Sequence, residues 1–221
     1  LLDPPVEGTR WGLGAAGTAD FTGTPLRGVL GQAGLDDDVV ECLFSGADEG
    51  DIPGWGRIRF ERSLGVSMAL SDTPLLAWAM NGRPLTREHG FPLRLLVPGY
   101  YAVASVKWLT RVEALSTSFD GHFQTDRYMY RDADGARPVT HMRVRALVTS
   151  HADGQRVPAG RVLVAGTAWS GRAAIAAVDV QVDNGDWQPA RVEPGSAAGL
   201  AARWRCELDL APGVHTVRVR A

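Results

Sequence analysis

The sequence predicts a mixed α+β domain over residues 1–135, followed by an immunoglobulin-like β-sandwich over residues 139–221. The first observation is a change of pattern at Pro138. Short helical and β-rich runs alternate before it, whereas apolar residues recur at every second position after it. The second observation is the polar segment RDADGARP at residues 131–138, which has the composition of a linker. The third is length, because 221 residues suit one large or two small domains.

The first domain opens with a short helix over residues 26–33. Thr24 would cap this helix, Pro25 suits its first turn, and Gly34 suits the position just past its end. The remaining predicted elements are, in chain order, a strand over residues 39–44, a loop over 46–56, a short helix over 63–70, a hairpin in which Asn81-Gly82 turns the strand 75–80, and strands over 93–97 and 106–115.

The second domain is predicted to consist of short strands separated by turns. Its alternating apolar residues are Met142, Val144, Ala146 and Val148, then Val162 and Val164, then Val178, Val180 and Val182, then Trp204, Cys206, Leu208 and Leu210, and finally Val217 and Val219. Residues 183–186 (DNGD) give a hairpin signal between two of these runs. This density of short strands and turns is typical of an immunoglobulin-like sandwich. Because the last run ends at Ala221, we expect the chain to be cut at its C-terminus.

The composition argues against several classes of protein. A net charge of −2 does not suit a general nucleic-acid or membrane-surface binder. No run approaches the roughly 18 apolar residues that a membrane span needs. Cys42 and Cys206 lie far apart in alternating apolar runs, so we expect two buried free thiols rather than a disulfide framework. Of the 23 basic residues only Lys107 is lysine, a compact point charge where arginine offers a planar fork.

One segment carries a candidate binding site, although self-contained catalytic motifs are absent. There is no Gly-x-Ser-x-Gly elbow, and no two of the five histidines have metal-ligand spacing, so no metal ligands are predicted. In residues 88–109, however, His89, Arg94 and Lys107 flank one predicted strand, with Pro-Gly and small residues between them. These donors suit a phosphate or another polar ligand through charge-assisted hydrogen bonds. A surface salt-bridge cluster would show the same spacing.

A series of short motifs runs through the chain in a fixed order. The motifs are Trp11-Gly12, Gly17-Thr18-Ala19, Thr22-Gly23, Gly46-Ala47-Asp48, Phe60-Glu61-Arg62-Ser63-Leu64, Met80-Asn81-Gly82, His89-Gly90-Phe91-Pro92-Leu93-Arg94, Ser105-Val106-Lys107-Trp108-Leu109, Ala168-Trp169-Ser170-Gly171 and Val178-Asp179-Val180. Together they resemble the sulfite oxidase family of molybdopterin-dependent oxidoreductases, and the resemblance covers the whole chain.

The resemblance implies a fold, a cofactor and a set of partners. The fold would be a sulfite-oxidase-type molybdopterin-binding domain followed by an immunoglobulin-like dimerisation domain. The cofactor would be molybdenum-molybdopterin, which transfers an oxo group to or from a small oxyanion, as from sulfite to sulfate. A separate electron acceptor such as a cytochrome, a homodimer, and a periplasmic, extracytoplasmic or membrane-associated location are also implied. By motif match, the pterin and its phosphate would be held by Asp48, His89, Arg94, Ser105, Val106 and Lys107.

The sequence departs from the family pattern at the metal ligand. In the family a cysteine in a Cys-x-Gly-Asn segment, upstream of the position of Trp11, binds molybdenum, and this sequence has no such segment. Cys42 follows the motifs that the ligand should precede, and Cys206 lies in the other domain. We therefore expect an N-terminally incomplete chain that, by itself, carries little molybdenum and is inactive.

Two candidate catalytic positions raise the question of substrate. Phe60 aligns with a tyrosine beside the metal in animal and plant sulfite oxidases, and it lacks the hydroxyl donor. Phe21 stands where tryptophan is usual, and Arg172 is the nearest match to an oxyanion-binding arginine of the second domain. The alternatives are a nitrate or sulfoxide reductase relative, or a non-catalytic homologue that serves as a dimerisation or binding module.

Overall fold

The computed structural model describes residues 15–133, 135–193 and 200–221. Contacts between Cα atoms divide the chain into two units. The first unit is Ala19–His141, and the second is Met142–Ala221 together with the described residues that precede Ala19.

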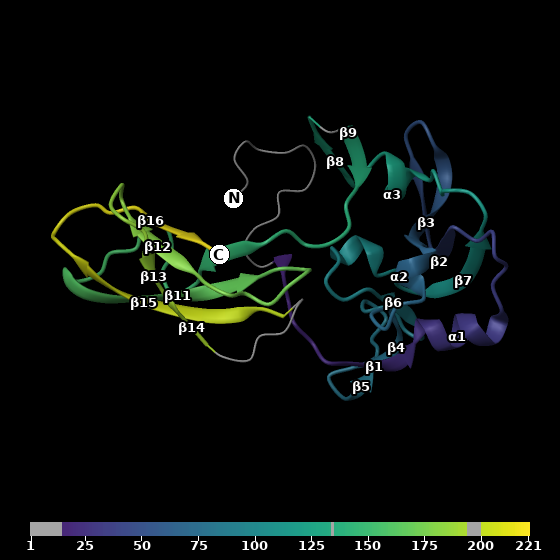
Figure 1. Cartoon of the computed structure of the whole chain (residues 1–221), viewed down its shortest axis with the longest axis horizontal. Coiled ribbons are helices and arrows are strands. Elements are labelled where there is room, and N and C mark those ends of the chain that lie inside the picture. Colours follow the sequence, from purple (N-terminus) through teal and green to yellow (C-terminus); the bar gives the residue numbers. More distant parts are fainter. Residues whose placement is uncertain (1–14, 134, 194–199) are drawn as a thin grey trace. The chain divides into compact units, whose positions relative to one another are not determined.

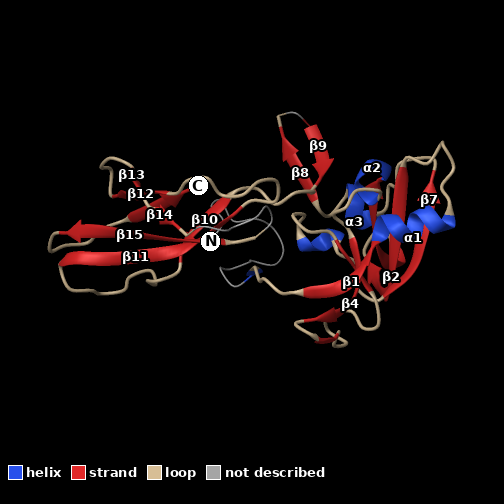
Figure 2. Cartoon of the chain, turned by 60° about the horizontal axis from the view of Figure 1, so that its bottom comes forward, coloured by secondary structure: helices blue, strands red, loops and turns tan. Residues whose placement is uncertain are grey.

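The described part of the first unit consists of strands and short helices, which Figure 2 distinguishes by colour. The elements, labelled in Figure 1, are β1 Phe21–Pro25, α1 Leu26–Ala33, β2 Glu41–Ile52, β3 Gly56–Gly65, α2 Val66–Ala69, β4 Leu75–Met80, β5 Arg83–Pro84, β6 Arg94–Leu96, the 3-10 helix η2 Ala102–Ala104, β7 Leu109–Leu115, α3 His122–Thr125, β8 Met129–Asp132 and β9 Gly135–Pro138. One sheet has the order β1-β4-β5 with β6 also paired to β4, a second has the order β3-β2-β7, and β8 pairs with β9.

Helix α1 forms over the residues that the sequence predicts. Leu26 and Leu30, one helical turn apart, are both buried, and the helix ends where Gly34 takes a φ of 77°. The prediction that Thr24 caps the helix is wrong. Thr24 belongs to β1, and Pro25 occupies the N-cap without a side-chain hydrogen bond.

The predicted loop over residues 46–56 is instead the outer part of the β2–β3 hairpin. The polar composition of this part misleads, because its charges pair across the two strands. Arg57 on β3 donates to Glu49 on β2 at 2.8 Å. Such opposite charges on facing strands stabilise the pairing modestly. The turn itself is confined to the residues between Ile52 and Gly56, where Gly54 takes a φ of 83°.

Helix α2 is shorter than the helix predicted over residues 63–70. Residues 63–65 extend β3, with Leu64 facing Cys42 of β2 in register. Leu64 and Cys42 both belong to the core, so their burial in the sheet overrides any local helical preference.

The hairpin predicted at Asn81-Gly82 is confirmed. Asn81 and Gly82 have φ values of 50° and 72°, which a two-residue primed turn requires, and they join β4 to β5. The strand predicted over residues 93–97 is also confirmed as β6. The strand predicted over residues 106–115 begins only at Leu109, directly after Trp108, whose φ is 49°.

The predicted linker, residues 131–138, falls mostly within the antiparallel β8–β9 hairpin. The linker prediction is wrong, because a polar, glycine-containing segment also suits a tight turn between exposed strands. The two units divide after His141. The predicted domain limits, 1–135 and 139–221, stay a prediction.

The core of the first unit lies between its sheets and α1. Phe44, Leu95 and Val106, from three different segments, are fully buried in it. Removing this apolar surface from water supplies most of the favourable free energy of folding. The site described below is attached to the same segments, so the core holds it in place.

The second unit consists of two sheets in its described part. Its strands are β10 Arg145–Val148, β11 Gly160–Trp169, β12 Asp179–Val182, β13 Gln188–Pro189, β14 Arg191–Val192, β15 Ala202–Leu210 and β16 Val217–Arg220. One sheet has the order β10-β11-β15-β14, and the other has the order β13-β12-β16. No helix occurs in residues 142–193 and 200–221, the described residues of this unit that follow the first one.

The period-two pattern of the second unit is confirmed in its longest strands. Along β15, residues alternate strictly between buried and exposed. Trp204 and Cys206 of β15 share one core cluster with Val178, which precedes β12, and Val180 of β12. The turn at residues 183–186 is also present, since Asp183 has a φ of 53° and β12 pairs with β13.

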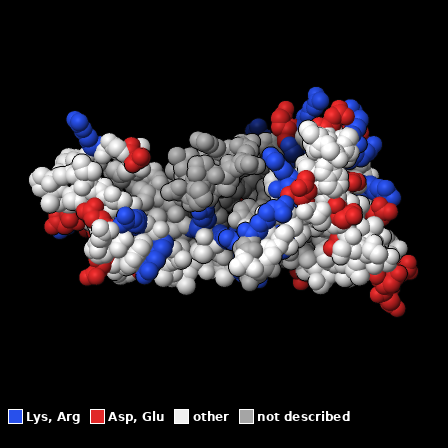
Figure 3. Space-filling model, turned by 90° about the horizontal axis from the view of Figure 1, so that it is seen from above, with Lys and Arg blue, Asp and Glu red and all other residues white. Residues whose placement is uncertain are grey.

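Charged side chains of both signs occur on each unit on the face shown in Figure 3, in keeping with the net charge of −2. Among the described residues, no helix has the length and apolar character needed to cross a membrane.

Candidate functional site

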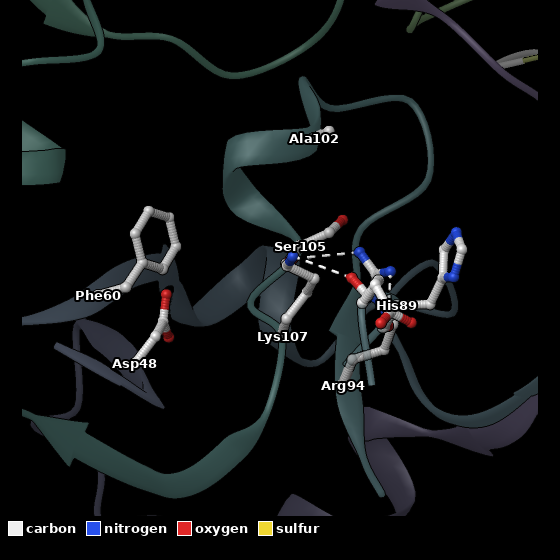
Figure 4. Close-up of a pocket in the computed structure, with 8 residues that line it drawn as sticks. Asp48, Phe60, His89, Arg94, Ala102, Ser105 and Lys107 are labelled. Atoms are coloured by element: carbon white, nitrogen blue, oxygen red, sulfur yellow. Dashed lines mark hydrogen bonds between the residues drawn. The ribbon is translucent and has the colours of Figure 1, made fainter. Parts of the chain in front are cut away.

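The first unit contains a cavity of about 320 Å³ that brings several predicted site residues together. Its lining residues are Asp48, Phe60, Glu88, His89, Arg94, Ala102, Ser105 and Lys107. In Figure 4, Asp48 and Phe60 lie on one side, Arg94 and His89 lie on the other, and Lys107 lies between them. Residues from separate strands and loops therefore face one space.

Asp48 reaches the cavity from an irregularity in β2. The β2–β3 register shifts between Ser45 and Glu49, which takes the intervening residues out of the regular ladder. Gly46 leaves room for this arrangement. A Cβ atom at Gly46 would lie 2.9 Å from the backbone oxygen of Lys107 and would overlap the Asp48 carboxylate.

The buried carboxylate of Asp48 has few hydrogen-bond and charge partners to offset its loss of contact with water. Its Oδ1 atom is buried and has no hydrogen-bond partner among the described residues. Burial raises the pKa of Asp48 above its usual range, and a backbone hydrogen bond and the Lys107 ammonium oppose this shift only in part. An unpaired buried acceptor is costly, so this atom is suited to receive an N–H group from a ligand.

Arg94 faces the cavity from β6. Its Nη1 donates to the His89 carbonyl at 2.9 Å and its Nη2 donates to the Ser105 carbonyl at 3.4 Å, while its Nε has no partner among the described residues. Burial lowers the pKa of Arg94, although arginine stays protonated in proteins. Two residues that line the cavity thus carry a buried polar atom without a partner among the described residues, a donor on Arg94 and an acceptor on Asp48.

A loop between β5 and β6 supplies His89. The Nδ1 atom of its ring lies 2.8 Å from the Thr86 hydroxyl, which fixes the ring's orientation. Gly90, with a φ of 100°, lies against Lys107 and Arg94. Only glycine adopts this backbone conformation without strain, so Gly90 lets the loop approach both cations closely.

Ser105 lines the cavity, whereas Val106 is not among its lining residues. The Ser105 hydroxyl accepts from the backbone N–H of Val97 at 3.1 Å, so it also fixes the local chain path. Val106 is fully buried in the core, and its carbonyl accepts from the backbone N–H of Leu95. A ligand contact at Val106 would therefore involve its backbone N–H rather than its side chain.

The two predicted catalytic residues lie in different units. Phe60, on β3, lines the cavity and packs against Phe123, with 4.7 Å between ring centroids. Arg172 belongs to the second unit, is exposed, and donates its backbone N–H to the Ser170 hydroxyl. It is not among the residues that line this cavity.

Both cysteines are buried free thiols, as predicted. Burial raises the pKa values of Cys42 and Cys206, which disfavours the thiolate that binds metal. No group of three His, Cys, Asp or Glu side chains in the described parts of the chain is arranged to hold a metal ion.

Three residues of the site were not singled out from the sequence. Glu88 and Ala102 line the cavity, and Trp108 lies directly behind Lys107, whose Nζ is 4.2 Å from the centroid of the indole ring. Glu88 and Trp108 belong to the motif-bearing segment, so their position beside His89 and Lys107 was the available signal. Ala102 has no functional group that could mark it in the sequence. Only the tertiary fold shows that it lines the cavity.

The family model of the oxidoreductase molybdopterin binding domain matches residues 2–123, and the chain belongs to this family. This finding confirms the resemblance to the sulfite oxidase family. The matched range includes the Trp11-Gly12 motif, which lies outside the described residues.

Three known proteins illustrate how similar this chain is to members of the family and related enzymes. Mitochondrial sulfite oxidase of Rattus norvegicus is 36% identical over 203 residues, which cover 85% of this chain and 36% of the rat protein. Inducible nitrate reductase [NADH] 1 of Glycine max is 34% identical over 130 residues, covering 57% of this chain and 14% of that protein. The crystal structure of the sulfane dehydrogenase SoxCD from Paracoccus pantotrophus matches with a TM-score of 0.78 and 27% identity, covering 91% of this chain and 51% of that one. The chain thus spans about half or less of each of these relatives.

Proposed function

We propose that this chain is part of a molybdenum-cofactor oxidoreductase of the sulfite oxidase type, which moves an oxygen atom to or from a small oxyanion such as sulfite. One observation carries the proposal: every residue that lines the cavity lies within the range matched by the molybdopterin-binding family, and the cavity holds two cationic side chains. The alternative of a surface salt-bridge cluster is disfavoured, since Arg94 and Lys107 donate to carbonyl groups rather than to carboxylates.

The hydrogen-bonding groups of the cavity suit both ends of molybdopterin, its phosphate group and its pterin ring. Arg94 and Lys107, with the Ser105 hydroxyl and His89, would bind the phosphate through charge-assisted hydrogen bonds. Asp48 would accept an N–H of the pterin at its unpaired Oδ1, and the free Nε of Arg94 would donate to a ligand oxygen. A ligand that offers both acceptors and donors would satisfy the two unpaired buried atoms together.

The bound cofactor would supply the oxo-transfer chemistry, and the protein would supply binding and electrostatics. Phe60 would shield its side of the cavity from water and would donate no hydrogen bond to an oxyanion. The role of Arg172 in oxyanion binding stays a prediction. The absence of a hydroxyl at Phe60 keeps substrates other than sulfite in consideration, among them the reduced sulfur species suggested by the name of sulfane dehydrogenase SoxCD.

Partners and fold details complete the proposal. Oxidation of sulfite releases two electrons, so an acceptor such as a cytochrome would receive them. The two-sheet second unit would form an immunoglobulin-like sandwich that supports a homodimer, as the resemblance implies. The similarity to a plant nitrate reductase supports reduction of an oxyanion as the second direction of the reaction. The periplasmic, extracytoplasmic or membrane-associated location stays a prediction.

Cofactor binding tests the proposal directly. Molybdopterin released anaerobically from a donor enzyme is titrated into the chain, and quenching of tryptophan fluorescence gives Kd. We expect saturable binding that weakens roughly 10-fold or more in Lys107→Met and in Arg94→Gln, because each loses a charge-assisted interaction. The control is Arg111→Gln, which removes an exposed arginine paired with Glu113 and should leave Kd unchanged. No binding by the unaltered chain, or equal Kd values in all variants, would overturn the proposal.

A further inference from the structure

Three consecutive backbone carbonyls of the loop before β6 accept hydrogen bonds from three side chains of the site. The Arg87 carbonyl accepts from the indole N–H of Trp108 at 2.8 Å, and the Glu88 carbonyl accepts from Lys107 Nζ at 3.0 Å. The His89 carbonyl accepts from Arg94 Nη1 at 2.9 Å. Residues 87–89 are called the carbonyl loop below.

The three donors differ in what an incoming anion would do to them. Lys107 and Arg94 are cations, and a phosphate oxygen forms a stronger hydrogen bond with a cation than a neutral carbonyl does. A bound phosphate would therefore compete with the Glu88 and His89 carbonyls for these two donors. The indole N–H of Trp108 is neutral and has a single donor, so its bond to the Arg87 carbonyl is exposed to less competition.

Trp108 also connects the carbonyl loop to the opposite wall of the cavity. Its own carbonyl accepts from the backbone N–H of Ala47 at 2.8 Å, next to Asp48 in the irregular part of β2. Its ring lies beneath Lys107 Nζ at 4.2 Å, a cation–π distance. One residue thus contacts the loop, the lysine and the strand that carries Asp48.

The backbone of Trp108 supports a special role. Its φ of 49° lies in the left-handed region, which a bulky residue rarely adopts and which costs free energy. This conformation occurs directly before β7, where the side chain crosses to Arg87 while the carbonyl faces Ala47. The surrounding hydrogen bonds hold the residue in this strained geometry.

We propose that Trp108 is a positioning residue that keeps the carbonyl loop against the cavity while Lys107 and Arg94 exchange loop carbonyls for the ligand's phosphate. This inference rests on the proposed function, because it names the ligand phosphate as the competitor. Its consequence is that the loop, and His89 with it, stays in place on binding even though two of the three side-chain hydrogen bonds to its carbonyls are weakened.

Hydrogen exchange and ligand binding together test the role of the indole N–H. In Trp108→Phe the ring is kept and the N–H is lost. Trp108→β-(3-benzothienyl)alanine keeps the two-ring shape and lacks the N–H. The matched control is Trp78→Phe, the same change at a tryptophan that is 46% exposed on β4. Amide exchange of a peptide covering residues 86–91 is followed with and without molybdopterin, and Kd and the urea midpoint are measured on each protein.

We expect both Trp108 variants to exchange about fivefold faster in this peptide, the effect of losing one hydrogen bond, with the larger increase when molybdopterin is bound. Kd should rise about fivefold or more, while the urea midpoint of the benzothienyl variant stays that of the control. A merely structural tryptophan would shift the midpoint without a ligand-dependent change in exchange, and that result would overturn the inference.

The failure of this inference is distinguishable from failure of the proposed function. If the unaltered chain binds molybdopterin and the two Trp108 variants bind and exchange as it does, only the positioning role is refuted. If exchange rises and Kd does not, the loop is anchored by Trp108 but its position does not matter for binding, which also refutes the role. If the unaltered chain does not bind molybdopterin, both proposals are refuted.

Discussion

Replacing Gly90 by alanine should disturb the site through two effects that the structure separates. The φ of 100° at Gly90 would place an alanine in a left-handed conformation, at a cost of about 1–2 kcal/mol. The new Cβ would also lie 3.0 Å from the Lys107 Cβ, 3.1 Å from the Lys107 Cα and 3.2 Å from the Arg94 Cβ. Such overpacking typically costs a further 1–3 kcal/mol. We therefore expect Gly90→Ala to lower the free energy of unfolding by about 2–5 kcal/mol.

Gly82→Ala provides the matched control. Gly82 has a φ of 72°, and a Cβ there would meet no atom within 4 Å, so only the backbone cost applies. Urea denaturation followed by tryptophan fluorescence gives both free energies of unfolding, with the m-value as a check on two-state behaviour. Gly90→Ala should also weaken molybdopterin binding, because the new methyl group pushes on both cationic side chains. Equal loss of stability in the two variants would refute the reasoning that contact with Lys107 and Arg94 matters.

Three further changes have defined outcomes. Arg62 is 2% exposed, donates to two backbone carbonyls, and has a pKa that burial lowers to about 10. Arg62→Met removes the buried charge but leaves those carbonyls unpaired, so urea denaturation should show a loss of about 1–3 kcal/mol, and a gain in stability would contradict this account. Both ring nitrogens of His215 face acceptors, Asp183 and a carbonyl, and the Asp183 hydrogen bond raises the pKa of His215. The stability that the imidazolium contributes should be complete below about pH 6.5 and lost as pH rises through the raised value; a pH series of urea midpoints should show this loss in the unaltered chain and not in His215→Gln. Finally, Cys42 and Cys206 should react with a thiol reagent only after urea is added, and rapid labelling of the native chain would contradict their burial.

Local patterns were sufficient for the parts of the fold whose stability is local. The Asn81-Gly82 turn depends on two residues that tolerate positive φ, and α1 depends on an apolar pair one turn apart. The alternation along β15 reflects a strand with one buried face, so period two in the sequence became period two in burial. The motif-bearing segment likewise indicated His89, Arg94 and Lys107, since phosphate recognition needs charged donors.

Long-range pairing decided the elements that the sequence misassigned. The β2–β3 hairpin extends through a polar, glycine-rich stretch because Arg57 on one strand pairs with Glu49 on the other, which no local pattern shows. Residues 63–65 join β3 rather than a helix because Leu64 is buried opposite Cys42. The β8–β9 hairpin occupies a segment with the composition of a linker.

By itself, then, the sequence determined the family and the residue types of the site, because specific motifs and charged donors are local properties of the chain. The tertiary structure decided which of these groups share a cavity and which of their atoms are left unpaired. Asp48 lies more than 40 positions before Arg94, and only the irregularity in β2 and the room at Gly46 bring its unpaired Oδ1 to the same space. The contacts of Trp108 with Arg87 and Ala47 likewise depend on three chain segments that meet only on folding. Burial and hydrogen-bond satisfaction are properties of that assembled arrangement, and no local pattern in the chain encodes them.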